Sequence, residues 1–125
     1  MKPGGDKMLA RATAALMRAE AHLAAGADDR ALERAYHAIF HAARAVLNEA
    51  GDRARSHVAI ADRVALLAPF GPASLGAAVA RALACRSDPD ALGPDDAQAL
   101  VTLAGGVVRD VRAFADDSPA LPTRK

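Results

Sequence analysis

Apolar residues recur every three or four positions over long stretches of this chain, and that periodicity predicts helices. The most regular stretch begins at Asp28 and Asp29 and runs to Gly51. Its apolar positions are Leu32, Ala35, Tyr36, Ile39, Ala43, Val46 and Ala50. An earlier stretch begins at Asp6, which can cap a helix, and ends at Gly26. Glycine accepts the left-handed conformation that commonly follows a helix, so both stretches have a predicted end.

Three further helices follow from the same reasoning. Ser56 can cap a helix whose apolar positions include Val58, Ala61 and Val64. A shorter helix runs from Leu75 to near Arg86, and a fifth begins around Pro94 and continues to Phe114. No stretch shows the strict alternation of a half-buried strand. We therefore predict an all-α fold, an up-and-down bundle of four to five antiparallel helices.

The length and composition of the chain indicate how many domains it contains. The chain has 125 residues, 52% of them hydrophobic, which suits one domain of ordinary size. We assign residues 6–115 to that domain, residues 1–5 to a flexible lead and residues 116–125 to a flexible tail. Alanine supplies much of the apolar content, and only 3% of the residues are aromatic. The core should therefore consist of closely approaching helices, which would also account for Gly105 and Gly106 inside the fifth helix.

Charge and cysteine content exclude several classes of protein. The net charge of +1 excludes a chain that binds polyanions over its whole surface, so any nucleic-acid contact must come from a local patch. Cys85 is the only cysteine, and an internal disulfide cannot form. The N-terminus lacks the apolar core of a signal peptide, and no run of about 18 apolar residues could span a membrane. We expect a soluble, cytoplasmic protein without membrane contact.

The polar face of the stretch from 28 to 51 holds the clearest chemical signal. Residues at helical spacing along this face are Arg30, Arg34, His37, His41, Arg44 and Asn48. At about 1.5 Å per residue, the Arg-His-His-Arg run extends roughly 15 Å along the helix axis. Histidine exchanges protons near neutral pH, and arginine grips phosphate with two parallel hydrogen bonds. This face can therefore bind an anion.

Metal binding is the alternative for the two histidines of this face. His37 and His41 stand four residues apart, a spacing at which two imidazoles of one helix can share a zinc ion. A structural zinc site needs further ligands, and neither His22 nor Cys85 has the motif spacing that would supply them. We expect no metal and no other cofactor.

Two segments of the chain resemble the HEPN superfamily, the higher eukaryote and prokaryote nucleotide-binding domain. The first is the run from Arg34 to Leu47, followed by Gly51 and by Arg55-Ser56-His57. The second is Ala82–Asp88, which is similar to the arginine-led segment of that family. The resemblance extends from Ala31 to Phe114. It implies a helical bundle that forms homodimers and is often encoded beside a nucleotidyltransferase, as a toxin and antitoxin pair.

The resemblance also implies candidate site residues. Catalytic members are metal-independent endoribonucleases marked by an arginine, four to six intervening residues and a histidine. Arg86 matches the arginine, but Ala91, Leu92 and Gly93 occupy the positions where the histidine would stand. If the chain cuts RNA, we expect His41, His57 and Arg86 to be catalytic. The candidate binding residues are Arg34, His37, His41, Arg44, Ser56, His57, Arg86 and Asp88.

Three functions remain open on these residues. Because the diagnostic histidine is missing, the first is a noncatalytic module that binds a nucleotide, RNA or a nucleotidyltransferase partner through the Arg/His face. The second is a metal-independent endoribonuclease toxin with its cleft between two subunits. The third is a purely structural helical scaffold.

Overall fold

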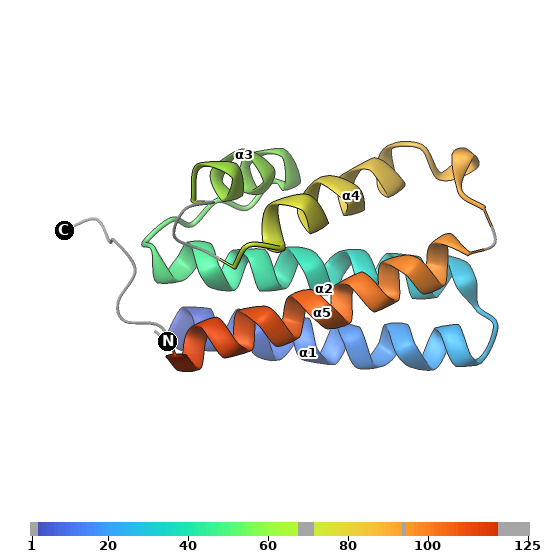
Figure 1. The fold of residues 1–125 in the computed structure, drawn as a ribbon, viewed down its shortest axis with the longest axis horizontal. Helices are drawn as coiled ribbons and strands as arrows, with labels where there is room; N and C mark the ends of the chain where they lie inside the picture. Colours follow the sequence, from blue (N-terminus) through green and yellow to red (C-terminus); the bar gives the residue numbers. More distant parts are fainter. Residues whose placement is uncertain (1–2, 68–71, 94, 118–125) are drawn as a thin grey trace.

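The computed structural model describes residues 3–67, 72–93 and 95–117, and within these ranges the chain is all-α (Figure 1). Its five α-helices are α1 (Pro3–Ala24), α2 (Asp28–Glu49), α3 (His57–Leu67), α4 (Leu75–Ser87) and α5 (Asp96–Asp117). A single 3-10 turn, η1 (Pro89–Ala91), lies between α4 and α5. The described residues contain no strand, which confirms the predicted fold class.

The helices form an up-and-down bundle around α2. In Figure 1, α1 and α4 run in one direction, whereas α2 and α5 run in the opposite direction. α2 contacts each of the other four helices, and its contact with α1 is the most extensive in the fold. Because α2 is central, only a narrow part of its surface is left for solvent.

Glycines end both α1 and α2, as predicted. Gly26 and Gly51 have φ angles of +75° and +83°, in the left-handed region that favours glycine. After Gly26, the Ala27 N–H donates to the His22 carbonyl at 2.9 Å. After Gly51, the Asp52 N–H donates to the Leu47 carbonyl at 2.8 Å. Each is the six-to-one hydrogen bond of a Schellman cap, so Gly26 ends α1 and Gly51 ends α2.

Other predicted boundaries need correction. α1 begins at Pro3, so residues 3–5 belong to its first turn and not to a flexible lead. Proline suits this position because the first helical N–H groups have no intrahelical acceptor. α5 continues to Asp117, so residues 116–117 of the predicted tail are helical. Residues 1–2 and 118–125 lie outside the described residues.

Ser56 caps α3, as predicted, but the apolar face of this helix was predicted only in part. The Ala59 N–H donates to the Ser56 hydroxyl oxygen at 3.1 Å, which is the geometry of an N-cap. Val58 is 64% exposed, whereas Ile60 and Val64 are the buried residues. A helix of eleven residues rich in alanine offers two possible apolar stripes, and packing against α2 and α4 selects one of them.

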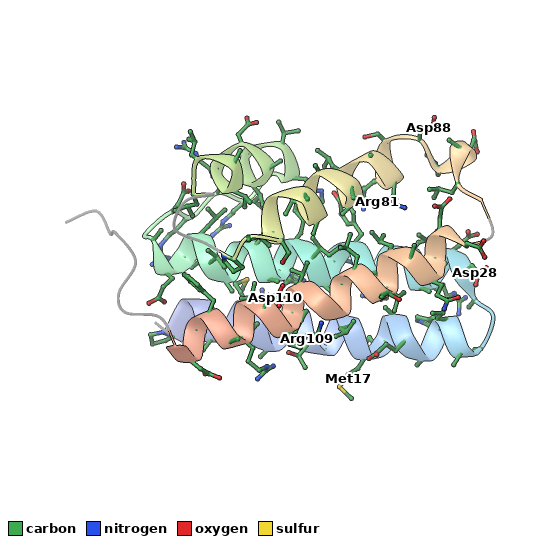
Figure 2. All side chains as sticks on the ribbon, viewed as in Figure 1. Met17, Asp28, Arg81, Asp88, Arg109 and Asp110 are labelled. Carbon is green, nitrogen blue, oxygen red and sulfur yellow. The ribbon has the colours of Figure 1, made fainter. Side chains whose placement is uncertain are left out.

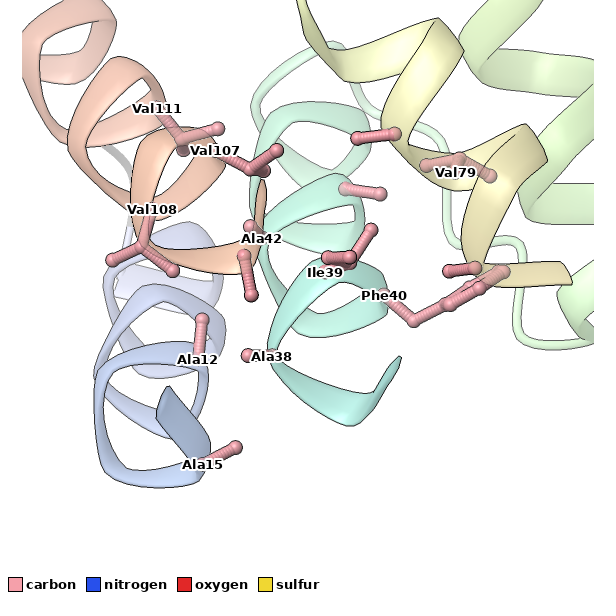
Figure 3. Packing of buried hydrophobic residues seen from close by; sticks show 14 of the residues in the cluster. Ala12, Ala15, Ala38, Ile39, Phe40, Ala42, Val79, Val107, Val108 and Val111 are labelled. Atoms are coloured by element: carbon pink, nitrogen blue, oxygen red, sulfur yellow. The ribbon is translucent and has the colours of Figure 1, made fainter. Parts of the chain in front are cut away.

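Alanine methyl groups fill the contact between α1 and α2 (Figure 3). Ala12 and Ala19 of α1 and Ala38 and Ala42 of α2 are all fully buried. Small side chains let two helix backbones approach closely, so the alanine-rich composition accounts for the extensive contact between α1 and α2. Larger side chains, among them Ile39, Val79 and Val107, fill the core on the sides of α2 that face α4 and α5.

Close helix packing does not explain the two glycines of α5, Gly105 and Gly106. A Cβ atom built on Gly105 would lie 4.0 Å from Leu16 Cδ1, and one on Gly106 would lie 3.7 Å from Arg109 Nη2. Both distances are ordinary van der Waals contacts, so alanine fits at either position. The expectation that helix contact requires these glycines is therefore wrong.

Among the described helices, none combines the length and the apolar character that crossing a membrane requires.

Candidate anion-binding site

The polar face of α2 lies between α1 on one side and the α3–α4 pair on the other. His37 and His41 stand one turn apart with their ring centroids at 6.3 Å. Both are half-buried, as are Arg34 and Arg44. Sequence periodicity predicted that these four residues share a face. A polar helix face is expected to be open to solvent, but here the flanking helices cover part of it.

A second group of side chains meets this face from α3 and α4. The Tyr36 hydroxyl of α2 hydrogen-bonds Nδ1 of His57, the first residue of α3. The Arg86 guanidinium of α4 lies over the Tyr36 ring, 4.8 Å from its centroid. Phe40 packs against both neighbours, with centroid distances of 4.7 Å to Tyr36 and 4.6 Å to the His57 ring. Residues far apart in the sequence are thus held together by aromatic contacts.

These groups form one electrostatic unit, which we call the basic cluster: Arg11, Arg34, His37, His41, Arg44, His57 and Arg86. Burial, together with the charges of His37, Arg44 and Arg11, lowers the pKa of His41 to about 4. Burial also lowers the pKa values of His37 and His57, with Arg86 acting on both. Glu33 opposes the shift at His37 and is the only carboxylate that acts on these three histidines among the described residues.

The hydrogen bond at His57 occupies one of its two ring nitrogens. Burial raises the pKa of Tyr36, so its hydroxyl stays protonated at neutral pH. This hydroxyl can donate to Nδ1 or accept from it, according to the tautomer of the imidazole. Nε2 is therefore the nitrogen of His57 that is left for a ligand.

Two polar atoms of the basic cluster are buried without a partner. They are Nδ1 of His41 and Nε of Arg44, one turn apart on α2, and no described residue offers either of them a hydrogen bond. An unsatisfied buried polar group costs about 1 to 3 kcal/mol. Arg44 Nε–H can only donate, so an oxygen acceptor is the partner that it lacks.

Two of the predicted site residues lie at helix ends. Ser56 is exposed, and its hydroxyl holds the N-terminus of α3. Asp88 follows the last residue of α4, where its N–H donates to the Ala84 carbonyl at 3.3 Å. Within the described ranges, no ion pair joins its carboxylate to Arg86.

Sequence reasoning missed Arg11 and the contact role of Tyr36. Arg11 and His41 each stand fifteen residues from Gly26, on opposite arms of the α1–α2 hairpin. In an antiparallel pair of helices this symmetry brings the two positions level, so the signal was present once Gly26 was recognised as the turn. Tyr36 was assigned to the core, and it is buried, but its hydroxyl also orients His57.

The described residues hold no group of three or more His, Cys, Asp or Glu side chains that could bind a metal ion. His37 and His41 have no third ligand among these residues. The chemistry available in the basic cluster is therefore hydrogen bonding and charge, supplied by imidazole and guanidinium groups.

A cleft of about 750 Å³ adjoins the basic cluster. It lies between the start of α2, the α4–η1 junction and the start of α5. Tyr36, Arg86 and Glu33 line this cleft, and the same three residues contact or act on the histidines of the basic cluster.

Comparison of the chain with protein-family models, with curated proteins and with solved structures gave no match.

Proposed function

We propose that this protein is a noncatalytic, HEPN-like binding module that holds the phosphate groups of a nucleotide or of RNA in the basic cluster. The observation that carries the proposal is the convergence of four arginines and three histidines from four helices, opposed, among the described residues, by the carboxylate of Glu33. Phosphate oxygens supply the acceptors that guanidinium and imidazole N–H groups need.

The protonation states support binding over cleavage. Cleavage of RNA without a metal needs one group that accepts a proton and another that donates one. All three cluster histidines have lowered pKa values, so the protonated acid is scarce at neutral pH. His57 has Nδ1 occupied by Tyr36. A bound phosphate favours charged imidazole, so we expect binding to take up protons and to tighten as the pH falls.

Binding can be measured by titrating labelled single-stranded RNA, and separately adenosine monophosphate, into the purified protein. The double variant Arg34→Gln and Arg86→Gln should weaken binding of the true ligand by more than about tenfold. The matched control, Arg18→Gln with Arg109→Gln, removes the same charge from exposed positions on α1 and α5 and should bind as the parent does. Equal losses in both double variants would show nonspecific attraction and would contradict the proposal.

A second candidate function is a metal-independent endoribonuclease. It is favoured because His57 and Arg86 both contact Tyr36, so that an imidazole and a guanidinium from separate helices lie close together. In this case the protein should cut RNA in the presence of a chelator. The products would carry a cyclic phosphate, because the ribose 2′-oxygen displaces the 5′-oxygen of the next nucleotide. His41→Ala, His57→Ala and Arg86→Ala should each abolish cleavage, and activity that persists in all three would reject these residues as its site.

We also propose, from the family resemblance, a cytoplasmic homodimer that acts with a nucleotidyltransferase partner. Light scattering of the purified protein tests the dimer. Co-purification with the product of an adjacent nucleotidyltransferase gene tests the pair. A monomer, or an adjacent gene of another class, would argue against this part of the proposal while leaving phosphate binding to its own test.

A further inference from the structure

The cleft beside the basic cluster has an apolar floor. Leu32, Leu92 and Leu100 line it, together with Ala97 and Cys85. Leu32 packs against the buried core and Leu100 belongs to it, but Leu92 is half-buried and does not pack against that core. Leu92 therefore presents apolar surface to the cleft. The volume of about 750 Å³ falls in the range of clefts that bury a ligand or a few side chains of a partner.

The rim of the cleft is acidic. Asp28, Asp29, Glu33 and Asp90 line it and are exposed, and Arg86 is the single basic residue in the lining, so the formal charge is −4 + 1 = −3. Figure 2 shows Asp28 at the end of the bundle where α4 leads into η1. Among the described residues, none of the four carboxylates takes part in an ion pair. Asp28 and Asp29 suit the positive end of α2, but that role does not explain Glu33 or Asp90.

We propose that this cleft binds a short segment of a partner protein in which an aliphatic side chain is flanked by lysine or arginine. The aliphatic side chain would cover Leu92 and the floor, and the flanking cations would meet the carboxylates on the rim. Charge complementarity selects this occupant, because a cleft of charge −3 repels phosphate whereas the basic cluster attracts it. The two adjoining surfaces therefore take ligands of opposite sign, and this inference does not depend on phosphate binding.

Cys85 provides a direct reporter of occupancy. It is the only cysteine of the chain, it lines the cleft, and it is half-buried with a free thiol. The probe is a capped, fluorescent pentapeptide that alternates lysine or arginine with leucine, and the control peptide has glutamate in place of the basic residues. The basic peptide should bind saturably, more weakly at high salt, and should slow alkylation of Cys85. The acidic peptide should do neither.

Paired variants test the rim and the floor separately. Asp29→Asn with Asp90→Asn should weaken binding of the basic peptide by about fivefold or more, since each exposed ion pair contributes a factor of up to about five. Leu92→Ala should weaken it at all salt concentrations, because the loss is apolar. The control, Glu20→Gln with Asp62→Asn, removes the same charge from exposed positions outside the cleft and should bind as the parent does.

Three results would overturn the proposal. In the first, the basic peptide shows no saturable binding. In the second, the cleft variants and the control variant lose peptide affinity equally. In the third, RNA protects Cys85 from alkylation and the peptide does not. Thermal unfolding of each variant identifies any that fails to fold, and Leu92→Ala, which leaves the buried core intact, then carries the test alone. RNA titrations on the same proteins separate this outcome from that of phosphate binding, because loss of the rim carboxylates should leave RNA affinity equal or higher.

Discussion

His41 should make the folded protein less stable as the pH falls, and the size of the effect follows from its surroundings. Its pKa is about 4 in the folded protein, against an ordinary value of 6.5. Since the folded pKa is the lower one, the unfolded chain binds more protons between these two values. Stability is therefore lost as the pH drops through 6.5 and levels off below the folded pKa. Proton linkage gives a loss of about 2 kcal/mol at about pH 5.

Partial solvent exposure of His41 screens the charges around it, which reduces the expected effect to about 1 to 2 kcal/mol. His41→Gln keeps a polar side chain but cannot titrate. Between neutral pH and about pH 5, the free energy of unfolding of this variant should therefore fall by about 1 to 2 kcal/mol less than that of the parent protein. Urea unfolding of both proteins at each pH measures the difference. Carboxylates titrate in both proteins, so their contribution cancels from the difference between the two free energies of unfolding. If the reasoning were wrong, His41→Gln would keep the pH dependence of the parent.

Further changes test the packing, each by urea unfolding. Gly105→Ala and Gly106→Ala should each raise the free energy of unfolding by up to about 1 kcal/mol, because alanine fits and favours helix. Gly51→Ala should lower it by about the same amount, since its φ is +83°, and stabilisation there would contradict the cap assignment. Ser56→Ala should cost about 1 kcal/mol, and no loss would reject the cap. Ala12→Leu should cost about 1 to 3 kcal/mol or more; a neutral result would mean that the α1–α2 contact is loose.

The sequence allowed the fold to be predicted where a single residue controls the backbone. Gly26, Gly51 and Ser56 act locally through left-handed dihedrals and a side-chain cap, so their effects can be read without knowing the tertiary structure. The start of α1 was missed because Pro3 can either open a helix or precede one. The buried face of α3 was predicted only in part: Val64 is buried as expected, but the neighbouring helices bury Ile60 and leave Val58 outside.

The site divides in the same way. Helical periodicity was sufficient to place His37 and His41 on one face of α2, because their relation lies within one element. The approach of Arg11, and the position of Arg86 over Tyr36, depend on how α1 and α4 pack, which the pattern of one helix does not contain. The acidic cleft was missed entirely, since its lining comes from α2, η1 and α5 and the segments between them.

The methyl-lined contact between α1 and α2 also bears on how a ligand can enter. Alanine has no side-chain rotamers to reorganise, so this pair of helices can adjust only by moving whole backbones apart. Arg11 and the histidines of α2 are consequently attached to one stiff frame. A ligand must then be accommodated by movement of the opposite wall, where Arg86 and His57 are carried by the shorter helices α4 and α3.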